Sequence, residues 1–230
     1  MNKFLTSGAV ALTLVAGGAL YMTQTAPTSG GMALPGAAMA QSQEGGAAEV
    51  DTSTIEDMTI GAEDAPIEVI EYASYTCPHC ASAHANLIPQ IKENYVDTGK
   101  VKFTYREVYF DKYGMWASMI ARCGGSEKFF GITDMIYKAQ DDFLAPARDG
   151  DEAGTADELR KIGRLAGLDS DQLDACLTDQ NKLRTLLTWY QENATRDDIT
   201  STPSFMIDGQ KYSNMNYADF AEILDEKLGE

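Results

Sequence analysis

The sequence has little positive charge. Its 230 residues include 18 Lys and Arg against 35 Asp and Glu, which gives a formal net charge of −17 at pH 7. A chain this acidic is repelled by phosphate backbones, so we expect no nucleic acid among its partners. With 44% hydrophobic and 23% charged residues, the composition also excludes collagen-like, coiled-coil and fully disordered chains. It suits one globular domain with an appendage.

Cysteine is scarce as well, and no internal repeat is visible. Four cysteines are too few for a small disulfide-stapled scaffold, but an even number is what two bridges need. Whether they pair depends on the redox compartment, and the N-terminus bears on that question.

Charge is nearly absent from the first forty residues, where Lys3 alone is charged. An apolar stretch follows from Phe4 to about Met22, which is the layout of an export signal, and cleavage after Ala40 would suit a signal peptidase. We therefore predict a signal peptide over 1–40. Because about 18 apolar residues approach the ~20 that span a bilayer, an uncleaved N-terminal anchor is the alternative. In either case Lys3 orients the rest of the chain outward.

The segment 41–65 is rich in Gln, Ser, Glu, Gly and Ala and has few large apolar residues, which predicts a flexible, solvated tether. Residues 66–74 and 101–108 combine β-branched and aromatic side chains in short runs, as strands do. Between them, apolar residues at helical spacing predict a helix from 78 to about 95. A strand, a helix and a strand in this order imply a parallel pair with a right-handed crossover.

The stretch from 111 to 197 contains no convincing strand. Clusters of Gly, Pro and Asp divide it into short segments, each with apolar residues at helical spacing. The predicted helices are 113–122, 128–140, 156–166, 170–177 and 181–195. We therefore predict a helical insertion over 111–197.

Near the C-terminus the sequence again contains residues that are typical of strands. Residues 203–207 form a predicted strand, and Asp208-Gly209 is a hairpin turn signal before a second arm at 210–212. An amphipathic helix follows at 217–228. The expected fold class is α/β, with the helical insertion placed between a βαβ half and a ββα half. These two halves are 66–110 and 198–230.

Cys77-Pro-His-Cys80 lies where the first predicted strand passes into the first predicted helix. Pro78 suits the first helical position, where its missing N–H costs nothing, so Cys77 becomes the N-cap. The Cys77 sulfur then lies among unpaired backbone N–H groups at the positive end of the helix dipole, which favours thiolate over thiol. His79 adds a donor to the same sulfur. Stabilising the thiolate of the reduced form makes the disulfide form a better oxidant.

This motif, at a strand-to-helix junction in an exported chain, resembles that of the DsbA-type thiol:disulfide interchange proteins of the thioredoxin superfamily. The resemblance extends over about 58–228, the helical insertion included, and implies a thioredoxin fold. It implies that Cys77 is the nucleophile that carries the mixed disulfide and that Cys80 is the buried resolving cysteine. Glu71 matches an acidic residue beneath the family's active site, to which proton transfer is attributed. Strand alternation leaves open whether Glu71 points inward or to solvent.

Thr202-Pro203 opens the third predicted strand and is similar to the family's cis-proline loop. A cis bond at this point would expose the backbone of Thr202 for pairing with an extended substrate. The resemblance, and not the sequence alone, carries this expectation.

Cys123 and Cys176 both fall in the helical insertion. In an oxidising compartment we expect them to form a structural disulfide, and closing a loop of this length stabilises the fold by ~4 kcal/mol in the chain-entropy model. Two buried free thiols and a second redox pair are the alternatives.

A metal site has less support. Cys77, Cys80 and His84 have a CxxC-x3-H spacing, but a fourth ligand is not evident, and thiols that cycle through a disulfide cannot hold zinc. We therefore predict no metal and no cofactor, and we expect His84 at the surface or lining a groove. Three residues at helical spacing are predicted as core rather than as a peptide groove: Met115, Trp116 and Met119.

The predicted function is that of a periplasmic dithiol oxidase, which donates the Cys77–Cys80 disulfide to reduced, unfolded exported proteins. The resemblance implies that a quinone-linked membrane oxidase similar to DsbB restores the disulfide, and we expect a monomer. A periplasmic thiol reductase, for example in cytochrome c maturation, is the first alternative, and His79 argues against it. A thiol-dependent chaperone or copper-binding protein that uses both thiols as soft ligands is the second.

Overall fold

The computed structural model of the chain describes residues 50–229. The predicted signal peptide, its cleavage site and the first part of the predicted tether lie outside these residues. None of the helices within 50–229 is long and apolar enough to cross a membrane.

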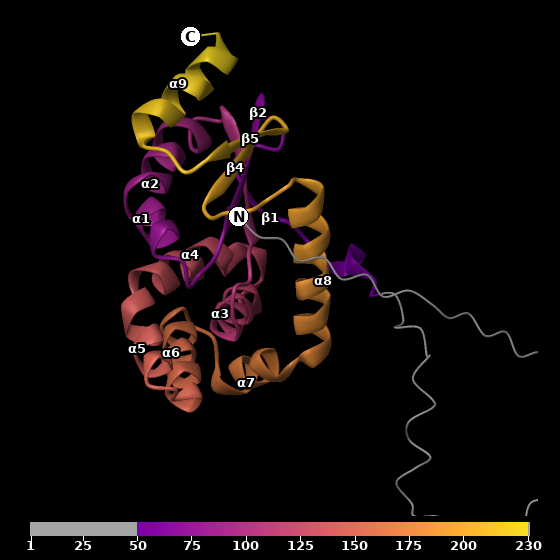
Figure 1. Cartoon of the computed structure of the whole chain (residues 1–230), viewed down its shortest axis with the longest axis vertical. Coiled ribbons are helices and arrows are strands. Elements are labelled where there is room, and N and C mark those ends of the chain that lie inside the picture. The colour runs from indigo at the N-terminus through magenta and orange to yellow at the C-terminus, as the bar shows by residue number, and fades with distance from the viewer. Residues whose placement is uncertain (1–49, 230) are drawn as a thin grey trace, which may run out of the picture. The chain divides into compact units, whose positions relative to one another are not determined.

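The helices fall into three groups along the chain (Figure 1). The first group consists of α1 (Pro78–Asn86), α2 (Ile88–Ile91) and the π-helix η2 (Lys92–Val96). The second consists of α3 (Lys112–Cys123), α4 (Gly125–Lys138), α5 (Gln140–Arg148), α6 (Glu152–Leu165), α7 (Ser170–Thr178) and α8 (Gln180–Arg196). The last is α9 (Tyr217–Leu228), at the predicted position, and a short 3-10 turn, η1 (Thr52–Thr54), precedes all of them.

Five strands form one mixed sheet. They are β1 (Met58–Ile60), β2 (Ile67–Ala73), β3 (Val101–Glu107), β4 (Ser204–Ile207) and β5 (Gln210–Ser213). Their order across the sheet is β1-β3-β2-β4-β5. The predicted parallel pair is confirmed as β2 and β3, and the other neighbouring strands are antiparallel.

The predicted helix over 78–95 is broken, which corrects the expectation from its apolar spacing. α1 ends at Asn86, α2 covers four residues, and η2 continues with π-type bonding. Pro89 explains the break, because it has no N–H to donate to a carbonyl one turn earlier. α5 was not predicted, because its sequence contains Pro146, a residue that helix interiors seldom accept.

Alternation along β2 divides the sheet into two buried faces. Val69 packs on one face with Phe220 of α9, in the same apolar cluster as residues of α1 and α2. Tyr72 points the other way and packs with Met206 on the side of α8. Glu71 follows Val69 by two residues, so its side chain shares the face that α1, α2 and α9 cover.

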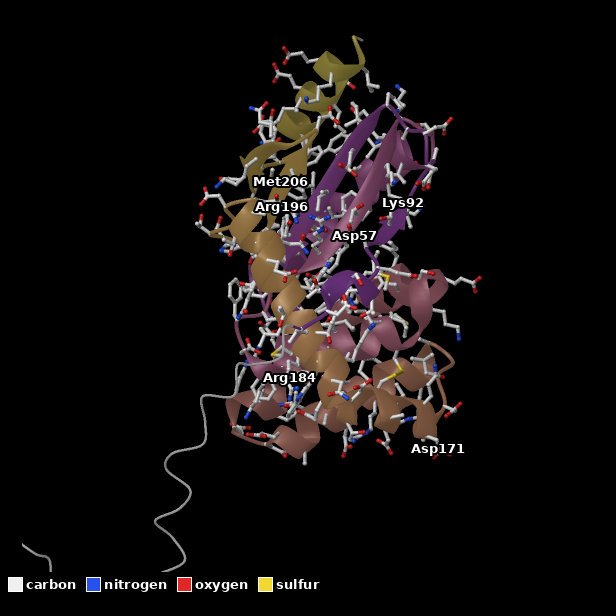
Figure 2. The ribbon with its side chains drawn as sticks, turned by 90° about the vertical axis from the view of Figure 1, so that its right-hand side faces the viewer. Asp57, Lys92, Asp171, Arg184, Arg196 and Met206 are labelled. Carbon is white, nitrogen blue, oxygen red and sulfur yellow. A yellow bond between two sulfur atoms is a disulfide. The ribbon has the colours of Figure 1, made fainter. Side chains whose placement is uncertain are left out.

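The insertion extends the core of the sheet. α3 to α7 gather at one end of the molecule, away from α9 (Figure 1). α8 returns from this end to the sheet, with Arg184 near its start and Arg196 at its end (Figure 2). Large apolar residues of the insertion join the same buried cluster as those of the sheet: Ile120, Phe129, Ile136, Phe143, Leu159 and Leu173.

β1 corrects the predicted tether over 41–65. Its residues pair antiparallel with β3, and Met58 lies opposite Tyr105 and is buried. Upstream of β1, Ile55 is buried against residues of α8. The segment 50–65 therefore belongs to the folded domain. A strand of three residues is too short to show alternation, which is why the sequence pattern did not reveal it.

A buried ion pair fastens β3 to α3. Arg122 donates from Nε and Nη2 to the two carboxylate oxygens of Glu107 over 2.6 and 2.7 Å, and Ser118 donates to the same carboxylate. The Arg122 and Glu107 side chains are only 4% and 1% exposed. Nη1 of Arg122 also donates to the Glu56 carbonyl, so the pair holds the segment before β1 as well.

Arg122→Met should lower the free energy of unfolding by about 3–5 kcal/mol, because it leaves the Glu107 carboxylate buried without its cation. Urea unfolding measures this loss. Arg160→Met is the matched control, since Arg160 pairs with Asp157 and Asp174 at the surface. Surface pairs contribute about 0–1 kcal/mol each. Equal losses in the two variants would contradict the role given to the buried pair.

Cys123 at the end of α3 and Cys176 in α7 are joined by a disulfide. Their Cα atoms lie 5.9 Å apart, and the bridge spans 53 residues of sequence. Of the arrangements that the sequence left open, the structure has the bridge and not two free thiols. The bridge crosses between two helices of the insertion and therefore limits how far they can separate in the unfolded chain.

Replacing both bridged cysteines, as Cys123→Ala/Cys176→Ala, should lower the free energy of unfolding by about 4 kcal/mol, because the unfolded chain gains the entropy of an open loop. Urea unfolding with Cys77 and Cys80 kept oxidised measures this effect. Thiol–disulfide exchange at Cys77 should keep its rate. A loss of exchange with no loss of stability would instead favour a second redox pair.

Candidate active site

The Cys77-Pro-His-Cys80 motif lies at the N-terminus of α1, as its sequence predicts. Cys77 is the N-cap, Pro78 occupies the first helical turn, and Cys80 follows within that turn. Both thiols are free, and the structure therefore holds the reduced form of the pair. Cys77 is 7% exposed and Cys80 is fully buried, so only Cys77 can meet an incoming protein.

Hydrogen bonds lower the pKa of Cys77 to about 5 from an ordinary value of 9.0. The largest contribution comes from the Cys80 thiol, which donates to the Cys77 sulfur, and partial burial opposes it. Thr202 and the backbone N–H groups of His79 and Cys80 supply further hydrogen bonds. These N–H groups are unpaired because they belong to the first turn of α1.

The pKa of Cys80 is shifted in the opposite direction. Its hydrogen bond to Cys77, its burial and the nearby charge of Glu71 all raise its pKa far above the ordinary value. At neutral pH the pair therefore holds one thiolate, at Cys77, and one thiol, at Cys80. Two sulfurs in the same helical turn thus have different protonation states.

The loop before β4 faces the Cys77 sulfur. The Thr202–Pro203 peptide bond is cis, as the resemblance implied, and Pro203 is buried. The Cys77 sulfur lies 3.6 Å from the carbonyl oxygen of Thr202 and, when it is protonated, donates to that oxygen. The backbone of Thr202 therefore lies beside the sulfur at which exchange would take place.

Two residues that sequence reasoning missed hold the loop before α1 from the side of the insertion. The side-chain amide of Gln140, at the start of α5, donates to the carbonyls of Tyr75 and Cys77 over 2.9 and 3.0 Å. Asp111, the N-cap of α3, accepts a hydrogen bond of 2.7 Å from the Thr76 hydroxyl. The residues next to Gln140 in the sequence do not indicate its hydrogen bonds, whereas Asp111 is recognisable as a helix cap.

Glu71 points inward, which answers the question that strand alternation left open. It is completely buried, and its Oε2 atom lies 3.0 Å from Nε2 of His84. This contact corrects the expectation that His84 lies at the surface, because the His84 side chain is only 9% exposed. His84 does line a pocket, which agrees with the groove that was the other expectation. The available sequence signal for the position of His84 was its i, i+4 spacing from Cys80, which puts both side chains on one face of α1.

The remaining predicted residues are also located. The side chain of His79 is exposed, and His79 hydrogen-bonds to the Cys77 sulfur through its backbone N–H. Met119 is buried, whereas Met115 and Trp116 are half-buried, so the prediction of core residues holds fully for Met119 alone. Within residues 50–229, no three His, Cys, Asp or Glu side chains are grouped so that they could hold a metal ion.

A dithiol at the N-terminus of a helix, a cis-proline beside it and a mixed sheet interrupted by helices together define a thioredoxin-fold protein with an inserted helical domain. The chain belongs to the thioredoxin family, because the family model described as Thioredoxin matches residues 53–226. The predicted fold class is thereby confirmed.

The resemblance to DsbA-type proteins is confirmed by solved structures and relatives. Alpha-DsbA1 of Wolbachia pipientis is 27% identical and has a TM-score of 0.69, over 76% of this chain and 92% of that one. A Rickettsia bellii protein, named among the protein-disulfide oxidoreductases, is 31% identical over 76% of this chain. Disulfide bond formation protein D of Bacillus subtilis is 23% identical over 71% of this chain and 72% of its own length. The chain spans 65% of the length of the Rickettsia bellii protein.

Cys80→Ala should raise the pKa of Cys77 from about 5, because it removes the thiol that donates to the Cys77 sulfur. The ultraviolet absorbance of the thiolate, followed against pH, measures this shift. His79→Ala should raise the pKa by less, since the backbone N–H remains. The variant Cys123→Ala/Cys176→Ala is the control, because it lies outside the site and should titrate as the wild type does. An unchanged midpoint in Cys80→Ala would contradict this account of the thiolate.

Proposed function

We propose that this chain is an exported thiol–disulfide oxidoreductase, and specifically a dithiol oxidase that donates the Cys77–Cys80 disulfide to newly exported proteins. The observation that carries the proposal is the position of Cys77 at the N-cap of α1, where hydrogen bonds lower its pKa to about 5. Stabilising this thiolate stabilises the reduced form, and the disulfide form then becomes a stronger oxidant. This stabilisation of the reduced form is complete above the ordinary thiol pKa of 9.0, and it is lost as the pH falls through about 5.

The proposed exchange needs only sulfur atoms and one proton. A substrate thiolate attacks the Cys77 sulfur, the Cys77–Cys80 bond breaks, and Cys80 leaves as a thiolate that takes up the proton. The second thiol of the substrate, once deprotonated, attacks the substrate sulfur of the mixed disulfide. Cys77 then leaves as a stabilised thiolate, so the substrate has lost two electrons and the site has gained them.

Substrate recognition and proton transfer are assigned to neighbouring groups. The Thr202 backbone beside the cis-Pro203 bond is proposed to pair with an extended substrate segment, because it lies next to Cys77. Glu71 is proposed to exchange the proton of Cys80, because it is buried on the same side of the sheet as α1 and its charge acts on that sulfur.

The cellular setting is proposed from the sequence. The predicted leader over 1–40 directs the domain to the periplasm, released by cleavage or held by an N-terminal anchor. A membrane oxidase similar to DsbB, linked to quinones, is the proposed partner that restores the Cys77–Cys80 disulfide. Reduced, unfolded exported proteins are the proposed substrates.

The reduction potential of the Cys77–Cys80 pair, measured in glutathione buffers, should lie well above about −270 mV, the value for thioredoxin. The reason is the stabilised Cys77 thiolate. The oxidised protein should also accelerate disulfide formation in a reduced, unfolded substrate, and Cys77→Ser should abolish this activity.

Two other results would contradict the oxidase. A potential near or below that of thioredoxin would favour a reductase. Tight copper binding without any acceleration of oxidative refolding would favour a copper-binding protein.

A further inference from the structure

Exchange at this site requires a route for one proton. The thiol of Cys80 must lose its proton before its sulfur can attack a mixed disulfide at Cys77, and it must regain a proton when the disulfide is reduced. Cys80 is fully buried, and its pKa lies far above the ordinary value, so solvent does not reach it directly. A group that exchanges protons with both Cys80 and solvent is therefore needed.

Glu71 supplies the inner half of such a route. Its carboxyl is completely buried, and Oε1 has no hydrogen-bond partner, unlike every other buried side-chain nitrogen or oxygen in the described part of the chain. A buried carboxyl oxygen without a partner is costly, and such atoms are rare in folded proteins. Oε2, the other oxygen, is held by Nε2 of His84.

His84 lies between this carboxyl and the outside of the protein. It follows Cys80 by one turn of α1, and its ring stacks on Tyr137 of α4 with centroids 4.1 Å apart. The same ring lines a pocket of about 250 Å³ between α1 and α4, together with Ala81 and Ala85. The imidazole therefore touches a buried carboxyl with one nitrogen and borders a surface pocket.

We propose that His84 carries the proton of Cys80 between the Glu71 carboxyl and solvent in the pocket. This inference rests on the proposed thiol–disulfide exchange and adds to it the path by which the site exchanges protons. During oxidation, one proton passes from Cys80 Sγ to Glu71 and on to His84 Nε2, and the opposite ring nitrogen releases one to solvent. During reduction the same steps run backwards.

The other titratable groups around His84 are unsuited to this transfer. Tyr137 of α4 and Tyr105 of β3 pack against its ring and hydrogen-bond to each other. Burial raises the pKa of both phenols well above the usual value, so they stay protonated. Asp134 and Lys138 of α4 line the pocket and pair with each other over 2.6 Å. Imidazole is the side chain that most readily exchanges protons near neutral pH.

The test follows the reaction of the reduced protein with glutathione disulfide, in which Cys80 must be deprotonated to release glutathione from Cys77. His84→Gln keeps a donor for Glu71 but cannot relay a proton. We expect it to slow the release step by about tenfold or more, as loss of a proton-transfer group does. The reverse reaction should slow by the same factor, so the equilibrium with glutathione and the pKa of Cys77 stay unchanged. His84→Asn is a second neutral variant, available if His84→Gln does not fold.

Rescue distinguishes proton transfer from packing. His84→Ala enlarges the pocket by removing the imidazole ring. Added imidazole can then enter this space and should restore the rate of release. Pyrazole, which has the same shape but is much less basic, should not restore it. Lys138→Met, at the same pocket, is the control and should react at the rate of the wild type.

The inference would be overturned by an unchanged rate in His84→Gln, by a rate change matched by a shift in the glutathione equilibrium, or by equal rescue by imidazole and pyrazole. Failure of imidazole to restore any rate would also count against it. Because glutathione exchange is measured whatever the reduction potential is, a low potential would refute the oxidase without affecting this test.

Discussion

The N-terminus of α1 is the point on which the other parts of the site depend. A thiolate at Cys77 requires donors, and the first turn of a helix provides N–H groups that have no partner within the helix. Cys80 and Thr202 add hydrogen bonds to the same sulfur, and these donors together outweigh the cost of partial burial. Gln140 fixes the Cys77 carbonyl from the insertion. The sulfur therefore depends on three segments that are far apart in the sequence.

The inserted helices also hold the loop that leads into the N-terminus of α1. Gln140 and Asp111 reach the loop before α1 from α5 and α3. Arg122 in turn holds α3 to Glu107 at the end of β3, and β3 is the parallel neighbour of the strand that leads into the motif. Displacing the insertion would therefore move the carbonyls that orient Cys77. The insertion is part of the site and not a separate lobe.

The sequence predicted the geometry of the Cys77–Cys80 dithiol better than that of its surroundings. Pro78 and Cys77 occupy the expected positions because helix capping is decided by neighbouring residues. Alternation did not decide the orientation of Glu71, because both faces of β2 carry large apolar residues, Val69 on the face of Glu71 and Tyr72 on the other. The contact with His84 was out of reach as well, because it requires knowing that this face of β2 packs against α1. Gln140 could not be found either, because its hydrogen bonds join segments more than sixty residues apart.

The opposite protonation states of the two sulfurs bear on the role of the buried contact between Glu71 and His84. A thiolate at Cys77 can be stabilised without any proton path, because it is formed and consumed at the edge of the site. A thiol at Cys80 cannot, since every change of redox state adds or removes its proton in a place that water does not reach. The same burial that makes Cys80 a poor thiolate also makes a carboxyl such as Glu71 costly there. An apolar residue at this position would avoid that cost, and the proposed proton exchange gives a reason for a carboxyl to be buried there.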